Sequence, residues 1–312
     1  MSDTVLFDAP GPVARARHRL LAVAGALVIL AFLAFALYRL GEKGNLAAAK
    51  WTPFLTSSMW VDYLLPGLLN TLKAAAISVV LATVFGLVFG IGRMSQVAPV
   101  RWLCTGVIEL FRSIPVLVMM IAAFQYYSYN NLFVSDISPL AAVVTGLTLY
   151  NGSVIAELLR SGVSSLPSGQ REAGLSIGLT SWQTLRRIQL PQAITAMLPA
   201  LVGQLVVVLK DTALGNIVLY PELLTNYQRI GSNWSNIVPA MIVIAVIYIV
   251  INYTLTVIAG RVEQRMRRAG RTAAVNIPRP SVRPGSGSGG LPPVLAVEDA
   301  VLDADEPHIG GR

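Results

Sequence analysis

The feature that most constrains this chain is a series of apolar segments, each long enough to cross a bilayer. About 20 mostly apolar residues in a helix span the hydrocarbon core. Charged residues make up only 13% of the 312 residues, against about 25% in an ordinary soluble domain, so the chain lacks the charge that a soluble surface needs. We therefore predict an all-α integral membrane protein. Five charge-free runs lie at 20–38, 74–92, 137–156, 190–209 and 237–259.

A sixth segment, near 102–127, is apolar apart from Glu109 and Arg112. The first segment could instead be a cleaved signal peptide. Its apolar run exceeds the roughly 7–15 residues usual in such peptides, which favours a retained helix. The prediction is therefore about six transmembrane helices, near 20–38, 66–92, 102–127, 138–159, 190–210 and 236–260.

The basic residues are distributed unevenly between the two sides that these spans define. With the N-terminus inside, and without counting the residues after 271, fourteen arginines fall in the inner segments and five basic residues in the outer ones. Lysine and arginine accumulate on the cytoplasmic side of membrane proteins. We therefore predict that both termini are cytoplasmic, and we interpret the net charge of +8 as an orientation signal rather than a nucleic-acid surface.

A long inner segment, 160–191, separates the fourth and fifth spans. Long ordered loops in compact proteins are usually functional. Its middle, 169–188, has the pattern of a helix that Ser168 could cap and that carries Glu172 in its first turn. Small residues leave one face of this helix open to close packing by another protein.

The same segment carries a motif whose spacing is similar to the EAA loop of ABC importer permeases. It reads E-A-G-x(3)-G-x(9)-I-x-L-P, whereas the family usually has a second alanine where Gly174 stands. The resemblance implies that a loop at about 168–191 docks on a separate ATPase. The residues implied in this coupling are Glu172, Ala173, Gly174, Gly178, Ile188, Leu190 and Pro191.

Further stretches resemble the polar amino-acid (His/Glu/Gln/Arg) permeases, and their sequence is most similar to that of actinobacterial glutamate permeases. Among them are N-T-L at 70–72, G-I-G-R-M-S at 90–95 and L-K-D-T-A-L at 209–214. The resemblance covers about 66–259. It implies a MetI-like five-helix core with an added N-terminal helix, in a bacterial plasma membrane. It also implies three partners: ATPase subunits that hold ATP and Mg, a sister permease or second copy, and an extracellular substrate-binding protein.

We predict that the chain is divided into four parts. Residues 1–19 are expected to form a cytoplasmic arm, and 20–65 the first transmembrane helix with an external loop. The permease core is expected at 66–262. We expect 263–312 to be a flexible cytoplasmic tail, because its Pro, Gly and Ser residues cannot build a packed core. A passive extension is favoured over a regulatory role.

No catalytic or metal site is expected in this chain. A phosphate-binding G-x-x-x-x-G-K-[ST] sequence is absent, so ATP must be bound and hydrolysed by a partner. With Cys104 as the only cysteine and with His18 and His308 near opposite ends, neither a disulfide nor a His-based triad fits the body of the chain. The alternative function is a secondary amino-acid transporter driven by an ion gradient, which would not need the EAA loop.

Two pairs of opposite charges lie inside predicted spans, where charges are costly and usually paired or functional. Glu109 and Arg112 are three residues apart, as are Glu157 and Arg160, so each pair shares one helix face. An interhelical ion-pair cluster at the cytoplasmic gate is the favoured interpretation. Direct contact with the substrate is the other.

A third set of polar residues is a candidate for the substrate pathway. Lys210 and Asp211 end the fifth predicted span. They could contact the carboxylate and ammonium groups of an amino acid, or they could only neutralise each other. Asn151 and Gln204 are further polar candidates within the spans.

The sequence G-L-V-F-G at 86–90 places two glycines four residues apart on the second predicted span. This spacing is typical of close packing between membrane helices. The partner helix could belong to the same chain or to a sister subunit.

Overall fold

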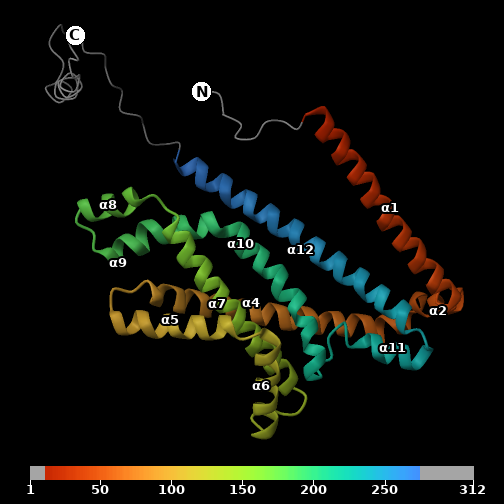
Figure 1. Cartoon of the computed structure of the whole chain (residues 1–312). Coiled ribbons are helices and arrows are strands. Elements are labelled where there is room, and N and C mark those ends of the chain that lie inside the picture. The colour runs from red at the N-terminus through yellow and green to blue at the C-terminus, as the bar shows by residue number, and fades with distance from the viewer. Residues whose placement is uncertain (1–10, 275–312) are drawn as a thin grey trace, which may run out of the picture. The chain divides into compact units, whose positions relative to one another are not determined.

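The structure is a computed structural model in which residues 11–274 are described. Every regular element in this range is a helix (Figure 1). The compact unit ends at Arg268, and the fold below is that unit. The beginning of the expected N-terminal arm, up to residue 10, and the expected tail from residue 275 lie outside the described residues.

Five helical segments are long and apolar enough to cross a membrane. This confirms the predicted all-α membrane fold. The helices that form them are α1 (Pro12–Glu42), α4 (Leu65–Arg93), α7 (Ser138–Ser164), α10 (Leu190–Asp211) and α12 (Ile237–Ala274).

The segment near 102–127, predicted as one transmembrane helix, is not a single straight helix. Two helices occupy this region, α5 (Ala98–Ser113) and α6 (Val116–Tyr129), and they meet at an angle of 98°. Proline has no N–H to continue a helix and disfavours helical backbone in the residue before it. Ile114, which precedes Pro115, is accordingly extended, with φ −90° and ψ 129°. Figure 1 shows α6 turning away from the axis of α5.

Short elements connect the long helices. On the side where α4 begins they are α2 (Ala48–Trp51), a 3-10 turn (Thr52–Leu55), α3 (Ser57–Met59) and a π turn (Trp60–Leu64). After α10 come a 3-10 turn (Thr212–Val218) and α11 (Asn226–Trp234). Between α7 and α10 lie α8 (Ser168–Ser176), α9 (Ser181–Thr184) and a π turn (Leu185–Gln189).

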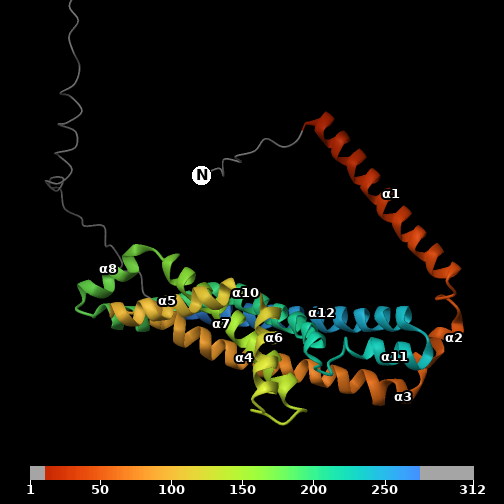
Figure 2. The same cartoon turned by 60° about the horizontal axis from the view of Figure 1, so that its bottom comes forward.

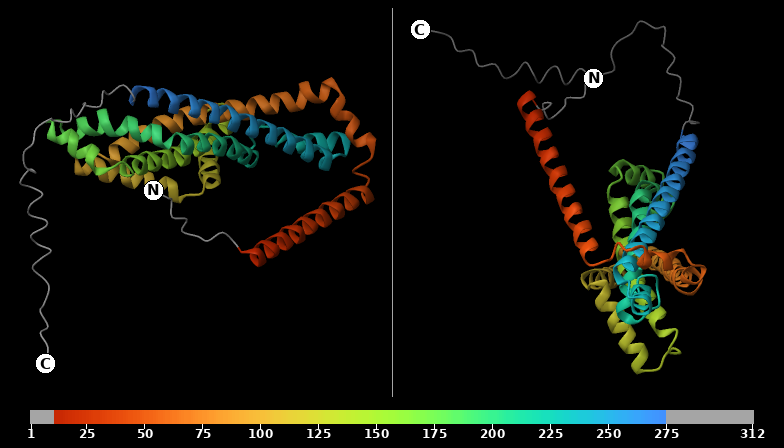
Figure 3. Two further views of the ribbon diagram at one scale, coloured as in Figure 1. Left: turned by 90° about the horizontal axis from the view of Figure 1, so that it is seen from above. Right: turned by 90° about the vertical axis from the view of Figure 1, so that its right-hand side faces the viewer.

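Helix α7 is at the centre of the packed core. Of its apolar window 61% is buried, whereas the window of α1 is 0% buried. The described core is therefore built by helices other than α1. Figures 2 and 3 show α4, α5, α7 and α10 gathered around one another.

Helices α4 and α7 approach each other closely in this core. A Cβ atom on Gly86 would lie 2.5 Å from Ile155 Cγ2, and one on Gly90 would lie 3.1 Å from Ala156 Cα. From the other side, a Cβ on Gly152 would lie 2.7 Å from Phe85 Cδ1. The two glycines of the G-x-x-x-G sequence therefore pack against α7 of the same chain.

Two hydrophobic clusters fill the bundle at different levels. One joins the elements before α4 to α11 and α12 through Met59, Leu64, Leu223, Ile230 and Ile244. The other joins α4, α6, α7 and α10 through Ala74, Met120, Val143, Leu147 and Val208. The first cluster packs the short elements before α4 against α11 and α12, and the second packs α4, α6, α7 and α10 against one another.

Candidate coupling loop and substrate site

The loop at 168–191 is two short helices rather than the single helix predicted over 169–188. Helix α8 ends at Ser176 and α9 begins at Ser181. Ser168 is the first residue of α8, and the residue before it, Pro167, occupies the cap position with no side-chain hydrogen bond. The predicted capping by Ser168 is therefore wrong.

Gly178 ends α8 in a left-handed backbone conformation, with φ +83°. Its N–H donates to the carbonyl of Leu175 at 3.0 Å, and the N–H of Leu179 donates to the carbonyl of Gly174 at 3.1 Å. This pair of bonds is a Schellman motif, which satisfies the last carbonyls of a helix and favours glycine. No atom lies within 4 Å of a Cβ built on Gly178, so there is room for a side chain. Glycine is favoured here by the left-handed backbone conformation.

Helix α9 begins with a capping box that the sequence analysis missed. Thr180 Oγ1 accepts from Gln183 N at 3.2 Å, and Gln183 Oε1 accepts from Thr180 N at 2.9 Å. The sequence T-S-W-Q fits this pattern, in which Ser or Thr stands three residues before Glu or Gln. From Ser181 the helix continues through the π turn into α10. Helix α9 and the span are therefore one continuous helical segment.

Gly174 holds α8 against α9. It is buried, and a Cβ on it would lie 2.7 Å from Thr184 Cγ2. The alanine usual in related permeases would not fit here without a shift of Thr184. The remaining coupling candidates divide by exposure: Glu172, Ala173, Gly178 and Pro191 are exposed, and Ile188 and Leu190 are half-buried.

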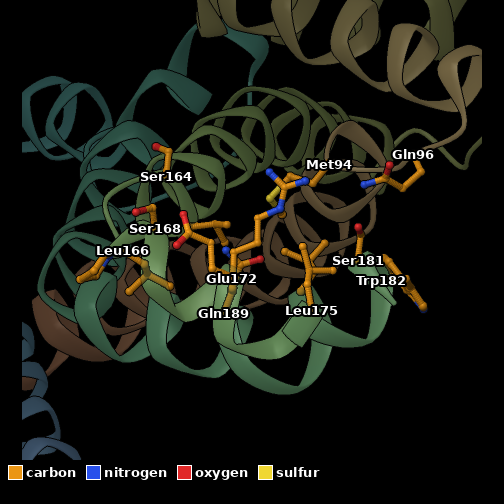
Figure 4. Close-up of a pocket in the computed structure, with 14 residues that line it drawn as sticks. Met94, Gln96, Ser164, Leu166, Ser168, Glu172, Leu175, Ser181, Trp182 and Gln189 are labelled. Carbon is orange, nitrogen blue, oxygen red and sulfur yellow. The ribbon is translucent and has the colours of Figure 1, made fainter. Parts of the chain in front are cut away.

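A hollow of about 590 Å³ lies beside these two helices (Figure 4). Glu172 and Leu175 of α8 and Trp182 of α9 line it, together with Met94 and Gln96 from the turn between α4 and α5. The turn between α4 and α5 and the coupling loop thus form one surface. Exposed apolar side chains on the loop, with Ile177 75% exposed and Trp182 47% exposed, suit contact with another protein.

The two predicted charge pairs meet in one cluster, with Arg93 at its centre. Arg93 Nη2 lies 2.9 Å from Glu109 Oε1, and Arg93 Nη1 lies 2.6 Å from Glu157 Oε2. Arg112 lies 3.1 Å from Glu109, and Arg160 Nε lies 3.1 Å from Glu157. Arg93 was not among the predicted site residues, although it stands as a lone charge at the end of an otherwise apolar run.

Asn151 and Gln204 lie together between α7 and α10. Gln204 Nε2 donates to Asn151 Oδ1 at 2.6 Å, and Asn151 Nδ2 donates to the carbonyl of Leu147 at 3.0 Å. Asn151 is fully buried. This pair is a polar link between two spans in an apolar interior, where hydrogen bonding of both partners is required.

Lys210 and Asp211 are not paired with each other in the described part of the chain. Consecutive residues of a helix point about 100° apart, so their side chains face different surroundings. Lys210 lines a groove of about 570 Å³ with Leu224 of the following loop and with Tyr248 and Asn252 of α12. Asp211 is half-buried.

Glu222 is a fully buried carboxylate that the sequence analysis did not single out. It accepts hydrogen bonds from Tyr248 Oη at 2.6 Å, Leu224 N at 2.7 Å and Thr225 N at 2.8 Å. Burial raises the pKa of this carboxyl above its ordinary value. Its sequence signal is that it is the lone acidic residue between Asp211 and the end of the last span.

A family of known proteins accounts for this arrangement. The model of the binding-protein-dependent transport system inner membrane component matches residues 58–268, which contain the packed core and the coupling loop. The chain belongs to this family. Its membership confirms the resemblance to MetI-like ABC importer permeases and makes the chain a transport subunit rather than an enzyme. The family implies ATPase and binding-protein partners.

Individual relatives agree with this assignment. The chain is 48% identical over 241 residues to the glutamate transport system permease protein GluD of Corynebacterium glutamicum, covering 77% of this chain and 88% of that protein. It is 31% identical over 222 residues to the glutamate/aspartate import permease protein GltK of Escherichia coli O157:H7, covering 69% and 97%. A crystal structure of an amino acid ABC transporter with histidines has a TM-score of 0.62 at 27% identity, covering 68% of this chain and 98% of that one.

Proposed function

We propose that this permease moves a polar amino acid, with glutamate as the first candidate, into the cytoplasm at the expense of ATP held by partner subunits. The observation that carries the substrate class is the 48% identity with the glutamate permease GluD over 77% of the chain. ATP and Mg would be bound by the ATPase, and this chain would bind no cofactor.

The coupling loop supports the proposal mechanically. Glu172 and Ala173 are exposed for contact with an ATPase, while Gly174, Ile188 and Leu190 hold the loop together. Because the helix from Ser181 runs without interruption into α10, movement of the docked loop would move a membrane span directly. We propose that Gly178 and Pro191 complete this coupling surface.

The experiment that tests the function is reconstitution with the candidate ATPase and substrate-binding protein in liposomes. We expect uptake of labelled glutamate that requires ATP inside and is reduced by competing acidic amino acids. Uptake abolished by an ionophore and unaffected by ATP would favour the ion-gradient alternative. Purification of the complex would also distinguish a sister permease, which we propose as the partner, from a second copy of this chain.

We further propose a bacterial plasma membrane orientation with both termini cytoplasmic. A reporter fused after Arg271 should be active on the cytoplasmic side, and one inserted between Leu46 and Trp60 should be external. The reason is the concentration of arginines in the inner segments. A cytoplasmic result for the second reporter would contradict the assignment of the spans.

For the substrate pathway, we propose that Lys210 attracts a carboxylate of the amino acid. Lys210 has no ion-pair partner among the residues that the structure describes. An unpaired ammonium in a mainly apolar groove is costly, and a ligand carboxylate would offset that cost. Asp211, Asn151 and Gln204 are proposed as further polar contacts along the same route. The cluster of Glu109, Arg112, Glu157 and Arg160 is proposed as the gate at the inner end.

Replacing Lys210 with Met and Asp211 with Asn tests this route. Both side chains keep their approximate volume, so we expect normal membrane yield and a half-saturation concentration for uptake raised about tenfold or more, as befits a lost charge-assisted hydrogen bond. The control is Lys43→Met, which removes a basic charge outside the groove. Unchanged uptake by the folded double variant would exclude the substrate role, and a lower maximal rate alone would point to the gate.

A further inference from the structure

Arg93 connects three helices at the inner end of the bundle. It is the last residue of α4, and its two ion-pair partners in the described chain are Glu109 of α5 and Glu157 of α7. A guanidinium is planar and presents several donors at fixed angles, so it can hold two carboxylates at once. The side chain is 16% exposed, so solvent screens these contacts only in part.

The other two arginines of the cluster are placed differently. Arg112 and Arg160 each lie three residues after a glutamate of their own helix, and their side chains are 39% and 43% exposed. Exposed pairs of this kind contribute little to stability. The one further link between helices is the contact of Arg112 with Glu157, at 3.4 Å. Arg93 therefore provides the short bonds between the helices.

Arg93 is also next to the coupling surface. The residue that follows it, Met94, lines the hollow beside α8 and α9, as does Gln96 (Figure 4). A partner that presses on this surface would contact both the coupling loop and the turn that begins after Arg93. The guanidinium that contacts Glu109 and Glu157 thus belongs to the residue next to this surface in the chain.

We propose that Arg93 is a positioning residue that makes the inner ends of α4, α5 and α7 move as one body when the coupling loop is displaced. This role rests on the proposed function as an ATP-driven importer. Without Arg93, Arg112 would still contact both Glu109 and Glu157, but α4 would lose its ion pairs with α5 and α7. The end of α4 would then be held to the other two helices by packing alone, and motion of the loop would be lost before it reached the gate.

The test compares Arg93→Gln and Arg93→Lys with wild type in the reconstituted complex. For Arg93→Gln we expect ATP hydrolysis to continue while the ATP consumed per amino acid moved rises about tenfold, within the range that coupling between sites spans. Arg93→Lys keeps the positive charge but not the planar guanidinium that holds two carboxylates, so it should recover part of the coupling. Arg101→Gln, a change in an exposed arginine of α5 without a carboxylate partner in the described chain, is the matched control and should behave as wild type.

The charge balance of the cluster favours folding of Arg93→Gln, because Arg112 and Arg160 remain beside Glu109 and Glu157. If the yield of Arg93→Gln is still low, Arg93→Lys is the second variant, because it keeps the charge and loses the planar guanidinium. Full wild-type coupling in Arg93→Lys would overturn the proposal, because it would show that only a positive charge is needed. An unchanged ATP cost in well-folded Arg93→Gln would overturn it as well.

A second measurement does not depend on transport and so separates this inference from the proposed function. Spin labels at Gln96 and Val163, in a Cys104→Ser background, report the distance between the α4–α5 turn and the end of α7. We expect one narrow distance distribution in wild type and in Arg101→Gln, and a broad one in Arg93→Gln. Equal widths would refute the role of Arg93 even if the complex imported nothing.

Discussion

Replacing Gly86 with leucine should leave almost no folded protein in the membrane. A Cβ at this position would already lie 2.5 Å from Ile155 Cγ2 and 2.9 Å from the carbonyl oxygen of Gly152, and the latter is backbone that cannot rotate away. Overpacking of a core usually costs about 1–3 kcal/mol, and a whole leucine between two backbones would cost more. The measurement is the yield of monodisperse protein in detergent and its thermal unfolding.

Gly203→Leu is the matched control for this prediction. Gly203 lies in the transmembrane helix α10, and no atom is within 4 Å of a Cβ built there, so this variant should be obtained in normal yield. Combining Gly86→Ala with Ile155→Ala should recover part of the yield, because one of the two obstructing groups is a side chain. A normal melting temperature for Gly86→Leu would show that α4 and α7 are farther apart than described.

Gly178→Leu is expected to abolish transport-coupled ATP hydrolysis while the protein still inserts and folds. Left-handed backbone costs a residue with a Cβ about 1–2 kcal/mol, which is too little to unfold a membrane bundle. It is enough to disfavour the Schellman turn that sets the angle between α8 and α9. The leucine would also project from an exposed position of the loop into the space that a docked ATPase needs.

Two variants separate these effects. Gly169→Leu adds the same side chain to α8, where no atom is within 4 Å and the backbone is not left-handed, so it reports bulk alone. Gly178→Asn keeps a residue that tolerates left-handed backbone and should retain part of the coupled hydrolysis. Coupled hydrolysis at the wild-type rate in Gly178→Leu would show that the ATPase docks elsewhere.

The membrane spans were predictable because the bilayer imposes a length that can be counted along the chain. The apolar runs in α4, α7, α10 and α12 were long enough to locate each helix from its own residues. The 98° bend between α5 and α6 was missed, although Pro115 is visible, because apolarity alone cannot distinguish one span from two helices.

The coupling loop was predictable for a similar reason, since its motif is contiguous in the sequence. Its division into α8 and α9 depends on Gly178 and on the capping box of Thr180, which are local signals that a search for one helix passed over. Whether the exposed residues of this loop couple to an ATPase stays a prediction.

The sequence by itself determined where the five long apolar helices lie and where the coupling motif stands, because each depends on residues close together in the chain. The orientation of the spans stays a prediction. Only the tertiary structure decided which charges meet. Arg93, Glu109 and Glu157 come from three helices, and Glu222 meets Tyr248 of a fourth. Such contacts arise from helix packing, in which glycines such as Gly86 set how closely the backbones approach, and no spacing along one segment specifies them.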